Sequence, residues 1–93
     1  MKKHLTAGGV LYNPSTQKVY LIHKVERDEW LLPKGHVENN EEITVAARRE
    51  LMEETGYTDL ILPTEDDFLD KVEITFMSKE GKEEFKEIYN YLI

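Results

Sequence analysis

The stretch from Gly35 to Tyr57 constrains the fold of this chain more than any other part of the sequence. Its second half has the spacing of a helix, since apolar or small residues recur at intervals of three and four positions. These residues are Ile43, Ala46, Ala47 and Leu51. One stripe of the predicted helix therefore faces a core. Glu50 lies on the same stripe, seven positions after Ile43, where the pattern calls for a hydrophobic residue.

The two ends of this helix are also marked in the sequence. Two asparagines followed by two glutamates, at residues 39–42, indicate its start. Asparagine side chains cap free backbone amides, and acidic residues suit the positive end of the helix dipole. Gly56 indicates its end, because the left-handed conformation that often follows a helix is easiest for glycine.

Three glutamates in the second half of the helix share one face. Glu50, Glu53 and Glu54 stand at positions i, i+3 and i+4. Burying a carboxylate without a partner is costly, and repulsion between like charges adds to that cost. A divalent cation would remove both costs, and carboxylate oxygens suit Mg²⁺ or Mn²⁺. The alternative is a solvated acidic helix in a glutamate-rich protein.

The spacing of the whole stretch resembles the Nudix box, the signature of the Nudix hydrolase family. All seven fixed positions of the box match, and Leu51 and Tyr57 fill its two hydrophobic positions. The fixed positions are Gly35, Glu41, Arg49, Glu50, Glu53, Glu54 and Gly56. With average residue usage, seven such matches arise by chance on the order of 10⁻⁹ times per starting position. Glutamate-rich composition weakens this figure without making chance competitive.

The resemblance implies an α+β fold, a Nudix-type α/β/α sandwich with a mixed β-sheet and a catalytic loop-helix. Residues 1–93 are expected to form a single Nudix domain. The final loop, strand and helix of the family are not expected within these residues, which leaves apolar surface on one face of the sheet. A fragment, a trimmed fold or a homo-oligomer that covers this face would account for it.

The resemblance also implies a reaction and the residues that carry it. Nudix enzymes hydrolyse a phosphate–phosphate bond in substrates that contain a linked nucleoside diphosphate. The metal ligands would be the Gly35 carbonyl and the carboxylates of Glu50, Glu53 and Glu54, with Glu50 as ligand or general base. Arg49 would hold the site by ion pairing, and Glu41 would pair with Arg49 or with a metal-bound water near the substrate. Candidates for a separate base are Glu73, Glu83, Glu84 and Glu87.

The segment before the box bears on the substrate. Trp30 to Glu38 reads WLLPKGHVE and resembles the diadenosine polyphosphate hydrolase branch of the family. Lys34 is expected to meet a phosphate oxygen, and His36 is a weaker candidate for a substrate contact. A dinucleoside polyphosphate such as diadenosine tetraphosphate is therefore the first expected substrate. A nucleoside triphosphate comes second and ADP-ribose or a nucleotide sugar third. A nucleotide-binding sensor without catalysis is a further alternative.

Composition narrows the class of protein. The net charge of −7, from 12 basic and 19 acidic residues, argues against a nucleic-acid-coating surface. The chain has no cysteine, so it has no disulfide framework. No apolar run approaches the roughly 20 residues of a membrane span, and the N-terminus lacks the apolar core of a signal peptide. We therefore expect a cytoplasmic protein that does not contact a membrane.

The remaining elements are predicted from alternation and turn residues. Two hairpins are expected, and the last of their strands has a helix over residues 82–88 as its alternative. Their strands are His4–Tyr12 with Lys18–Val25, and Lys71–Met77 with Glu84–Ile93. Residues 59–62 are predicted to form a short strand. Residues 33–36 are predicted to form a loop, and residues 64–70 an acidic loop anchored by Phe68.

Overall fold

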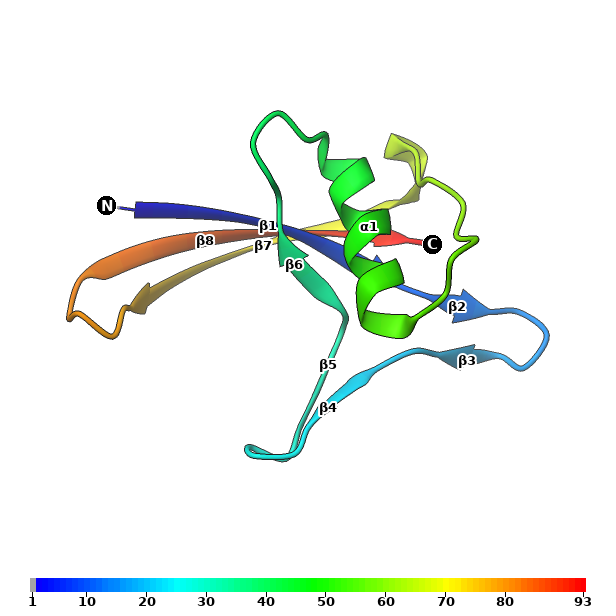
Figure 1. Cartoon of the computed structure of the whole chain (residues 1–93), viewed down its shortest axis with the longest axis horizontal. Coiled ribbons are helices and arrows are strands. Elements are labelled where there is room, and N and C mark those ends of the chain that lie inside the picture. Colours follow the sequence, from blue (N-terminus) through cyan, green and yellow to red (C-terminus); the bar gives the residue numbers. More distant parts are fainter. Residues whose placement is uncertain (1) are drawn as a thin grey trace.

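The computed structural model describes residues 2–93, which form a four-stranded sheet with one α-helix packed on one face (Figure 1). The strands are β1 (Lys2–Val10), β2 (Tyr12–Asn13), β3 (Lys18–Val19), β4 (Ile22–Lys24), β5 (Glu29–Leu31), β6 (Lys34–His36), β7 (Phe68–Met77) and β8 (Glu83–Leu92). The helices are α1 (Ile43–Thr55) and the short 3₁₀ turn η1 (Glu65–Asp67). The described helices include none of the length and apolar character needed to cross a membrane.

The main sheet has the strand order β6-β1-β8-β7. β1 and β8 run parallel along their whole length, from the pair Lys2↔Glu84 to the pair Val10↔Leu92. β6 and β7 run antiparallel to their neighbours β1 and β8. The mixed sheet and the α+β class implied by the Nudix resemblance are therefore confirmed.

The core lies between α1 and the centre of this sheet. Ala46 and Ala47 of the helix pack against Ala7 of β1 and Tyr91 of β8, all of them buried. Leu51, one turn further along the helix, is also fully buried. Small residues in β1 and α1 let the backbones approach closely, and a Cβ added at Gly9 would overlap the Tyr91 carbonyl. The apolar stripe predicted for the helix therefore faces the core as expected.

The C-terminal hairpin is confirmed, and each of its strands extends beyond the predicted start. β7 pairs with β8 from Phe68↔Tyr91 to Met77↔Glu83, with an irregularity between Phe68 and Asp70. The Ser78 N–H donates to the Lys82 carbonyl at 2.8 Å across the turn, and Gly81 takes a φ of 77°. The helix alternative for residues 82–88 is therefore wrong. Non-local pairing with β1 and β7 holds this segment as a strand.

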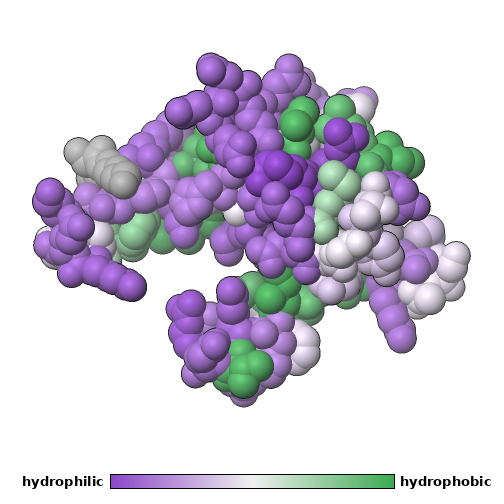
Figure 2. Space-filling view, in the orientation of Figure 1, coloured by the Kyte–Doolittle hydropathy of each residue, from purple (hydrophilic) through white to green (hydrophobic). Residues whose placement is uncertain are grey.

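The N-terminal hairpin is formed only at its tip. β2 and β3 share two pairs, Tyr12↔Val19 and Asn13↔Lys18, whereas β1 pairs with β6 and β8. The second predicted strand is interrupted, and its latter part, β4, pairs with β5. The β4–β5 hairpin stands away from the body of the molecule (Figures 1 and 2). On it, the His23 and Trp30 rings stack at 4.3 Å, and Trp30 is 62% exposed.

Three local predictions need correction. Residues 34–36 form β6, because Ala7 of β1 pairs with Gly35. Residues 59–62 form no strand. The helix begins at Ile43, later than the asparagines at 39 and 40 indicated, and Asn40 takes a φ of 64°.

The physical reason for the late start lies in residue 41. Its carboxylate accepts a hydrogen bond from the Glu38 N–H at 3.0 Å, which fixes a turn before the helix. Glu42 stands at the N-cap without a side-chain cap bond. The predicted end is confirmed, since Gly56 takes a φ of 83° and its N–H donates to the Met52 carbonyl at 2.9 Å.

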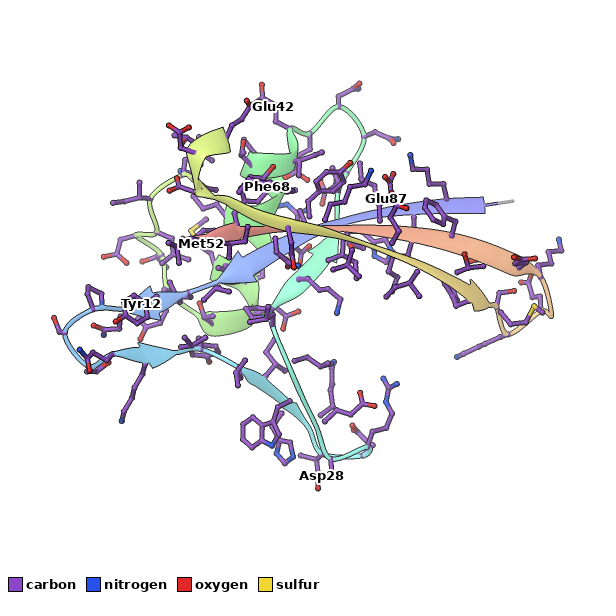
Figure 3. All side chains as sticks on the ribbon, turned by 180° about the vertical axis from the view of Figure 1, so that it is seen from behind. Tyr12, Asp28, Glu42, Met52, Phe68 and Glu87 are labelled. Carbon is purple, nitrogen blue, oxygen red and sulfur yellow. The ribbon has the colours of Figure 1, made fainter. Side chains whose placement is uncertain are left out.

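The sheet face turned away from α1 carries exposed apolar side chains. Lys71 of β7 pairs with Tyr89, which packs against the core, so the Lys71 side chain lies on the helix-facing side of the sheet. Because side chains alternate along a strand, Val72, Ile74 and Phe76 lie on the opposite face. Val72 is 37% and Ile74 41% exposed. Figure 3 views the sheet from behind, where β7 crosses in front of α1. The apolar surface expected on one face is therefore present.

Candidate functional site

Arg49, in the middle of α1, is the centre of a polar network. Its guanidinium donates to the Glu41 carboxylate at 2.8 and 2.9 Å, a bidentate pair, and to the His36 carbonyl at 2.9 Å. It also donates to Glu50 at 2.7 Å and to Glu53 at 3.3 Å. The loop after β6 and two turns of the helix are thereby joined through one side chain.

Glu50 is the glutamate on the apolar stripe, and the structure shows how it is accommodated. Its side chain is 12% exposed and lies against Gly35 in β6. A Cβ at position 35 would overlap the Glu50 carboxylate, so glycine makes the space that this group occupies. The strand and the helix therefore meet at a carboxylate, and Arg49 supplies its countercharge.

Glu53 and Glu54 are more open to solvent. The Glu53 side chain is 58% exposed and shares the Arg49 guanidinium with Glu50. Glu54 is exposed, and no hydrogen bond or ion pair joins it to another side chain of residues 3–93. Arg49 therefore brings together two of the three predicted ligand carboxylates, those of Glu50 and Glu53. The third, Glu54, is the residue after Glu53 in the helix.

The electrostatics of Glu41 follow from this arrangement. Hydrogen bonds from Arg49 lower the pKa of the Glu41 carboxyl to about 2, against the opposing effect of its partial burial. The hydrogen bonds that Arg49 donates, chiefly the two to Glu41, raise the pKa of Arg49 above its ordinary value. Arg49 and Glu41 therefore remain charged throughout the neutral range.

The low pKa of Glu41 predicts a loss of stability in acid. The folded pKa lies below the ordinary value of 4.5, so Glu41 contributes its full stabilisation above about pH 4.5. That contribution falls as pH drops through the folded pKa near 2. We expect the urea concentration at the midpoint of unfolding to decrease when the pH is lowered from 5 to 2. The fall should be smaller in Glu41→Gln, and an equal fall in both proteins would contradict this role for Glu41.

Lys34 and His36 lie on the other face of β6. Alternation along the strand directs their side chains away from the face on which Gly35 meets Glu50. Burial is the main cause that lowers the pKa of Lys34, followed by the nearby charges of Lys86 and Lys24. The His36 ring lies 5.8 Å from the His4 ring. These predicted substrate contacts are thus separated from the three glutamates by the edge of the sheet.

Three of the four candidates for a separate base are held by lysine or histidine side chains of the sheet strands. Glu87 is buried on the helix-facing side of β8, paired with Lys3 and with Lys71 at 2.5 Å. Glu73 pairs with the same Lys71 at 3.2 Å, and Glu84 contacts His4 at 2.5 Å. The burial of Glu87 between two lysines was not predicted, because it depends on the alignment of three strands.

The predicted metal ligands are compatible with a divalent cation by the chemistry of their donor atoms. Gly35 leaves room for the Glu50 carboxylate, and Glu53 and Glu54 lie one turn further along the helix. Carboxylate and carbonyl oxygens are the donors that Mg²⁺ and Mn²⁺ take in proteins. Within residues 2–93 no three such side chains converge as they stand, and Arg49 holds Glu50 and Glu53 in ion pairs.

The Gly35–Glu50 contact predicts the outcome of a small change. In Gly35→Ala the added methyl would displace the end of a flexible side chain, so we expect the free energy of unfolding to change by less than about 1 kcal/mol. The Glu50 carboxylate would move away, and the turnover implied by the Nudix resemblance should fall about a hundredfold. Thermal unfolding and turnover of the same preparation measure both effects. Wild-type turnover in Gly35→Ala would show that the position of Glu50 does not matter.

Comparisons with known proteins agree with this geometry. Residues 2–92 match the family described as the NUDIX domain. An 8-oxo-(d)GTP phosphatase from Mycolicibacterium smegmatis is 47% identical over 51 residues, which are 55% of this chain and 16% of that protein. This chain therefore spans a small part of the curated relative that it matches.

Solved structures show the same fold. An Ap4A hydrolase from C. elegans has a TM-score of 0.57 and 24% identity, over 99% of this chain and 68% of that one. A MutT protein from Methanosarcina mazei has a TM-score of 0.66 and 21% identity, over 99% and 65%. A MutT/nudix family protein from Enterococcus faecalis has a TM-score of 0.60 and 27% identity, over 100% and 38%. The match over residues 2–92, the mixed sheet and the loop-helix built around Arg49 together show that this chain belongs to the NUDIX domain family.

Proposed function

We propose that this protein hydrolyses a phosphate–phosphate bond in a nucleoside diphosphate-linked substrate, with a dinucleoside polyphosphate such as diadenosine tetraphosphate as the preferred substrate. The observation that carries the proposal is the network in which Arg49 joins Glu41, Glu50 and Glu53 beside Gly35. A purely structural acidic helix would have no need to place Glu50 on its core-facing stripe.

The residues have distinct roles in this reaction. Glu50, Glu53, Glu54 and the Gly35 carbonyl would hold Mg²⁺ or Mn²⁺. When bound, the metal neutralises phosphate charge and lowers the pKa of an attacking water. Glu50 is a ligand or the general base. Arg49 is a positioning residue, because it orients Glu50 and Glu53 and ties the helix to the His36 carbonyl.

Phosphate binding is assigned to the other side of the β6 edge. Lys34 is partly buried beside two other cations, and an anionic phosphate there would offset the repulsion among them. His36 lies two residues along the same strand and contributes its ring from the same face. A substrate long enough to pass over the edge would contact both groups, and a polyphosphate chain meets that requirement.

A nucleoside triphosphate is the second candidate substrate. It is favoured by the mycobacterial relative, named an 8-oxo-(d)GTP phosphatase, which shares 47% identity over 51 residues. Both candidates use the same phosphate chemistry and differ in what is attached beyond the phosphates.

A product assay separates these possibilities. The protein is incubated with Mg²⁺ and, in turn, diadenosine tetraphosphate, 8-oxo-dGTP and ADP-ribose, and products are resolved chromatographically. The highest kcat/KM is expected for diadenosine tetraphosphate, with ATP and AMP as products. A higher value for 8-oxo-dGTP would support the second candidate. Metal-dependent binding without turnover of any substrate would contradict the hydrolase proposal and favour a nucleotide sensor.

A further inference from the structure

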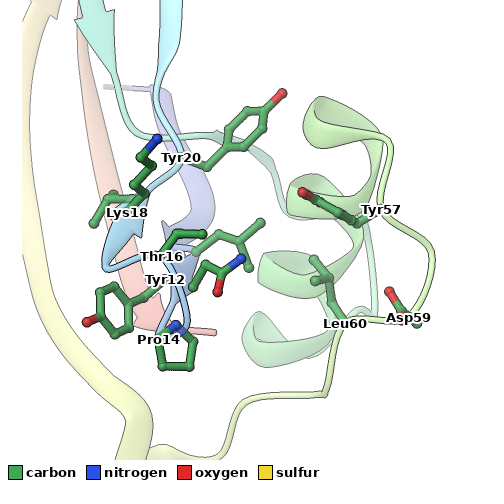
Figure 4. Close-up of a pocket in the computed structure, with 11 residues that line it drawn as sticks. Tyr12, Pro14, Thr16, Lys18, Tyr20, Tyr57, Asp59 and Leu60 are labelled. Atoms are coloured by element: carbon green, nitrogen blue, oxygen red, sulfur yellow. The ribbon is translucent and has the colours of Figure 1, made fainter.

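A pocket of about 490 Å³ lies between the β2–β3 hairpin and residues 57–60, which follow α1 (Figure 4). Its size falls within the roughly 300–1,000 Å³ of small-molecule sites. Its walls are mainly apolar and aromatic, with a few polar groups among them, as in such sites. None of the residues predicted to carry catalysis lines it.

Three tyrosines line this pocket while remaining open to water. Tyr12 is 41%, Tyr20 37% and Tyr57 52% exposed. The rings of Tyr20 and Tyr57 come from segments far apart in the sequence and meet edge to face, with centroids 6.5 Å apart and planes at 77°. Folding therefore leaves aromatic surface in the pocket that a flat ligand would bury, and nucleobases stack on such rings.

The charged groups of the pocket suit the polar parts of a nucleoside. Among the described residues that line the pocket, Asp59 is acidic and Lys18 is basic. A carboxylate accepts hydrogen bonds from the exocyclic amino group of a base, and an ammonium donates to sugar or phosphate oxygens.

The pocket adjoins the end of the helix that carries the glutamates. Tyr57 follows Glu54 by three residues, and Gly56 between them ends the helix, so their Cα atoms lie within about 11 Å, the reach of three fully extended residues. A substrate whose phosphates lie at Glu53 and Glu54 would therefore reach the pocket with its sugar and base. Resting on the proposed hydrolysis, we propose that this tyrosine-lined pocket holds one nucleoside of the substrate.

The first test measures nucleoside binding without metal or turnover. Adenosine and guanosine are titrated separately into the protein in EDTA, and the NMR signals of the tyrosine rings are followed. We expect at least one nucleoside to shift the signals of Tyr20 and Tyr57. Its affinity should fall roughly tenfold in Tyr57→Ala, the low end of the effect of removing a stacking ring.

Two control variants separate stacking from general surface effects. Tyr57→Phe keeps the ring, and Ile61→Ala changes an apolar side chain nearby that is 84% exposed and does not line the pocket. Both should bind within about twofold of the wild type. Shifts confined to other parts of the protein, wild-type affinity in Tyr57→Ala, or no binding of either nucleoside would overturn the proposal.

A kinetic measurement keeps this inference distinct from the hydrolase proposal. With diadenosine tetraphosphate and Mg²⁺, Tyr57→Ala should raise KM about tenfold and leave kcat within twofold, because the ring lies away from the scissile bond. An unchanged KM would overturn the role of the pocket while hydrolysis stands. Nucleoside binding at Tyr57 without any hydrolysis would retain the pocket and contradict the hydrolase proposal.

Discussion

Replacing Glu53 or Glu54 with glutamine is expected to lower the rate of metal-dependent hydrolysis by about a thousandfold or more. Each substitution removes a negative ligand from the proposed cation, and metal stabilisation of phosphate charge contributes several kcal/mol to the transition state. Each 1.36 kcal/mol corresponds to a factor of about ten in rate. The measurement is kcat with saturating Mg²⁺ and diadenosine tetraphosphate.

The fold should survive these two substitutions. Both side chains are exposed, and glutamine keeps their shape. The loss of the Arg49–Glu53 contact should cost little, because exposed ion pairs contribute about 0–1 kcal/mol. Glu42→Gln is a matched control, since Glu42 is also an exposed glutamate at the N-cap of the same helix and makes no side-chain cap bond. Near-normal rates in both Glu53→Gln and Glu54→Gln would place the metal elsewhere.

Arg49→Met is expected to destabilise the protein and to abolish most of its activity. The substitution keeps much of the aliphatic stem but leaves the carboxylates of Glu41 and Glu50 without their countercharge, each with a side chain only 12% exposed. Removing one partner of a fully buried ion pair costs about 3–5 kcal/mol. Arg49 is 23% exposed, so we expect a smaller loss of about 2 kcal/mol.

For a domain of this size, such a loss lowers the melting temperature by about 10 °C. Arg49→Lys should recover part of the stability but little of the activity, because an ammonium cannot reproduce the bidentate bond to Glu41. Turnover should fall about a hundredfold in both variants when Glu50 and Glu53 lose their common partner. A melting temperature within 2 °C of wild type in Arg49→Met would refute the central position of this residue.

The features predicted correctly from the sequence are those with local causes. Gly56 ends the helix through its own backbone conformation, and the core stripe of α1 follows from helical spacing. The strands β7 and β8 alternate and are joined by a short turn, so they pair with each other. The ion pairs of Arg49 were implied by the resemblance to the Nudix box, whose charged members stand within one loop-helix.

Most of the features that were missed depend on partners distant in sequence, and the late start of the helix is the exception. β6 exists because β1 pairs with it, and its residues alone resemble a loop. The helix starts late because the Glu41 carboxylate bonds the Glu38 N–H and Arg49. The parallel pairing of β1 with β8 joins segments about eighty residues apart, and no local pattern indicates it. The tyrosine-lined pocket likewise joins the β2–β3 hairpin to the segment after α1.

The most direct test of the account is the position of a bound manganese ion. Crystals grown with Mn²⁺ are measured for anomalous scattering, which locates the metal independently of the reaction. We predict an anomalous peak close to Glu50 and the Gly35 carbonyl. The metal should bond to carboxylate oxygens of Glu53 and Glu54 at about 2.1 Å, the length typical of such ions. A fully occupied site away from residues 35 and 50–54 would contradict this prediction.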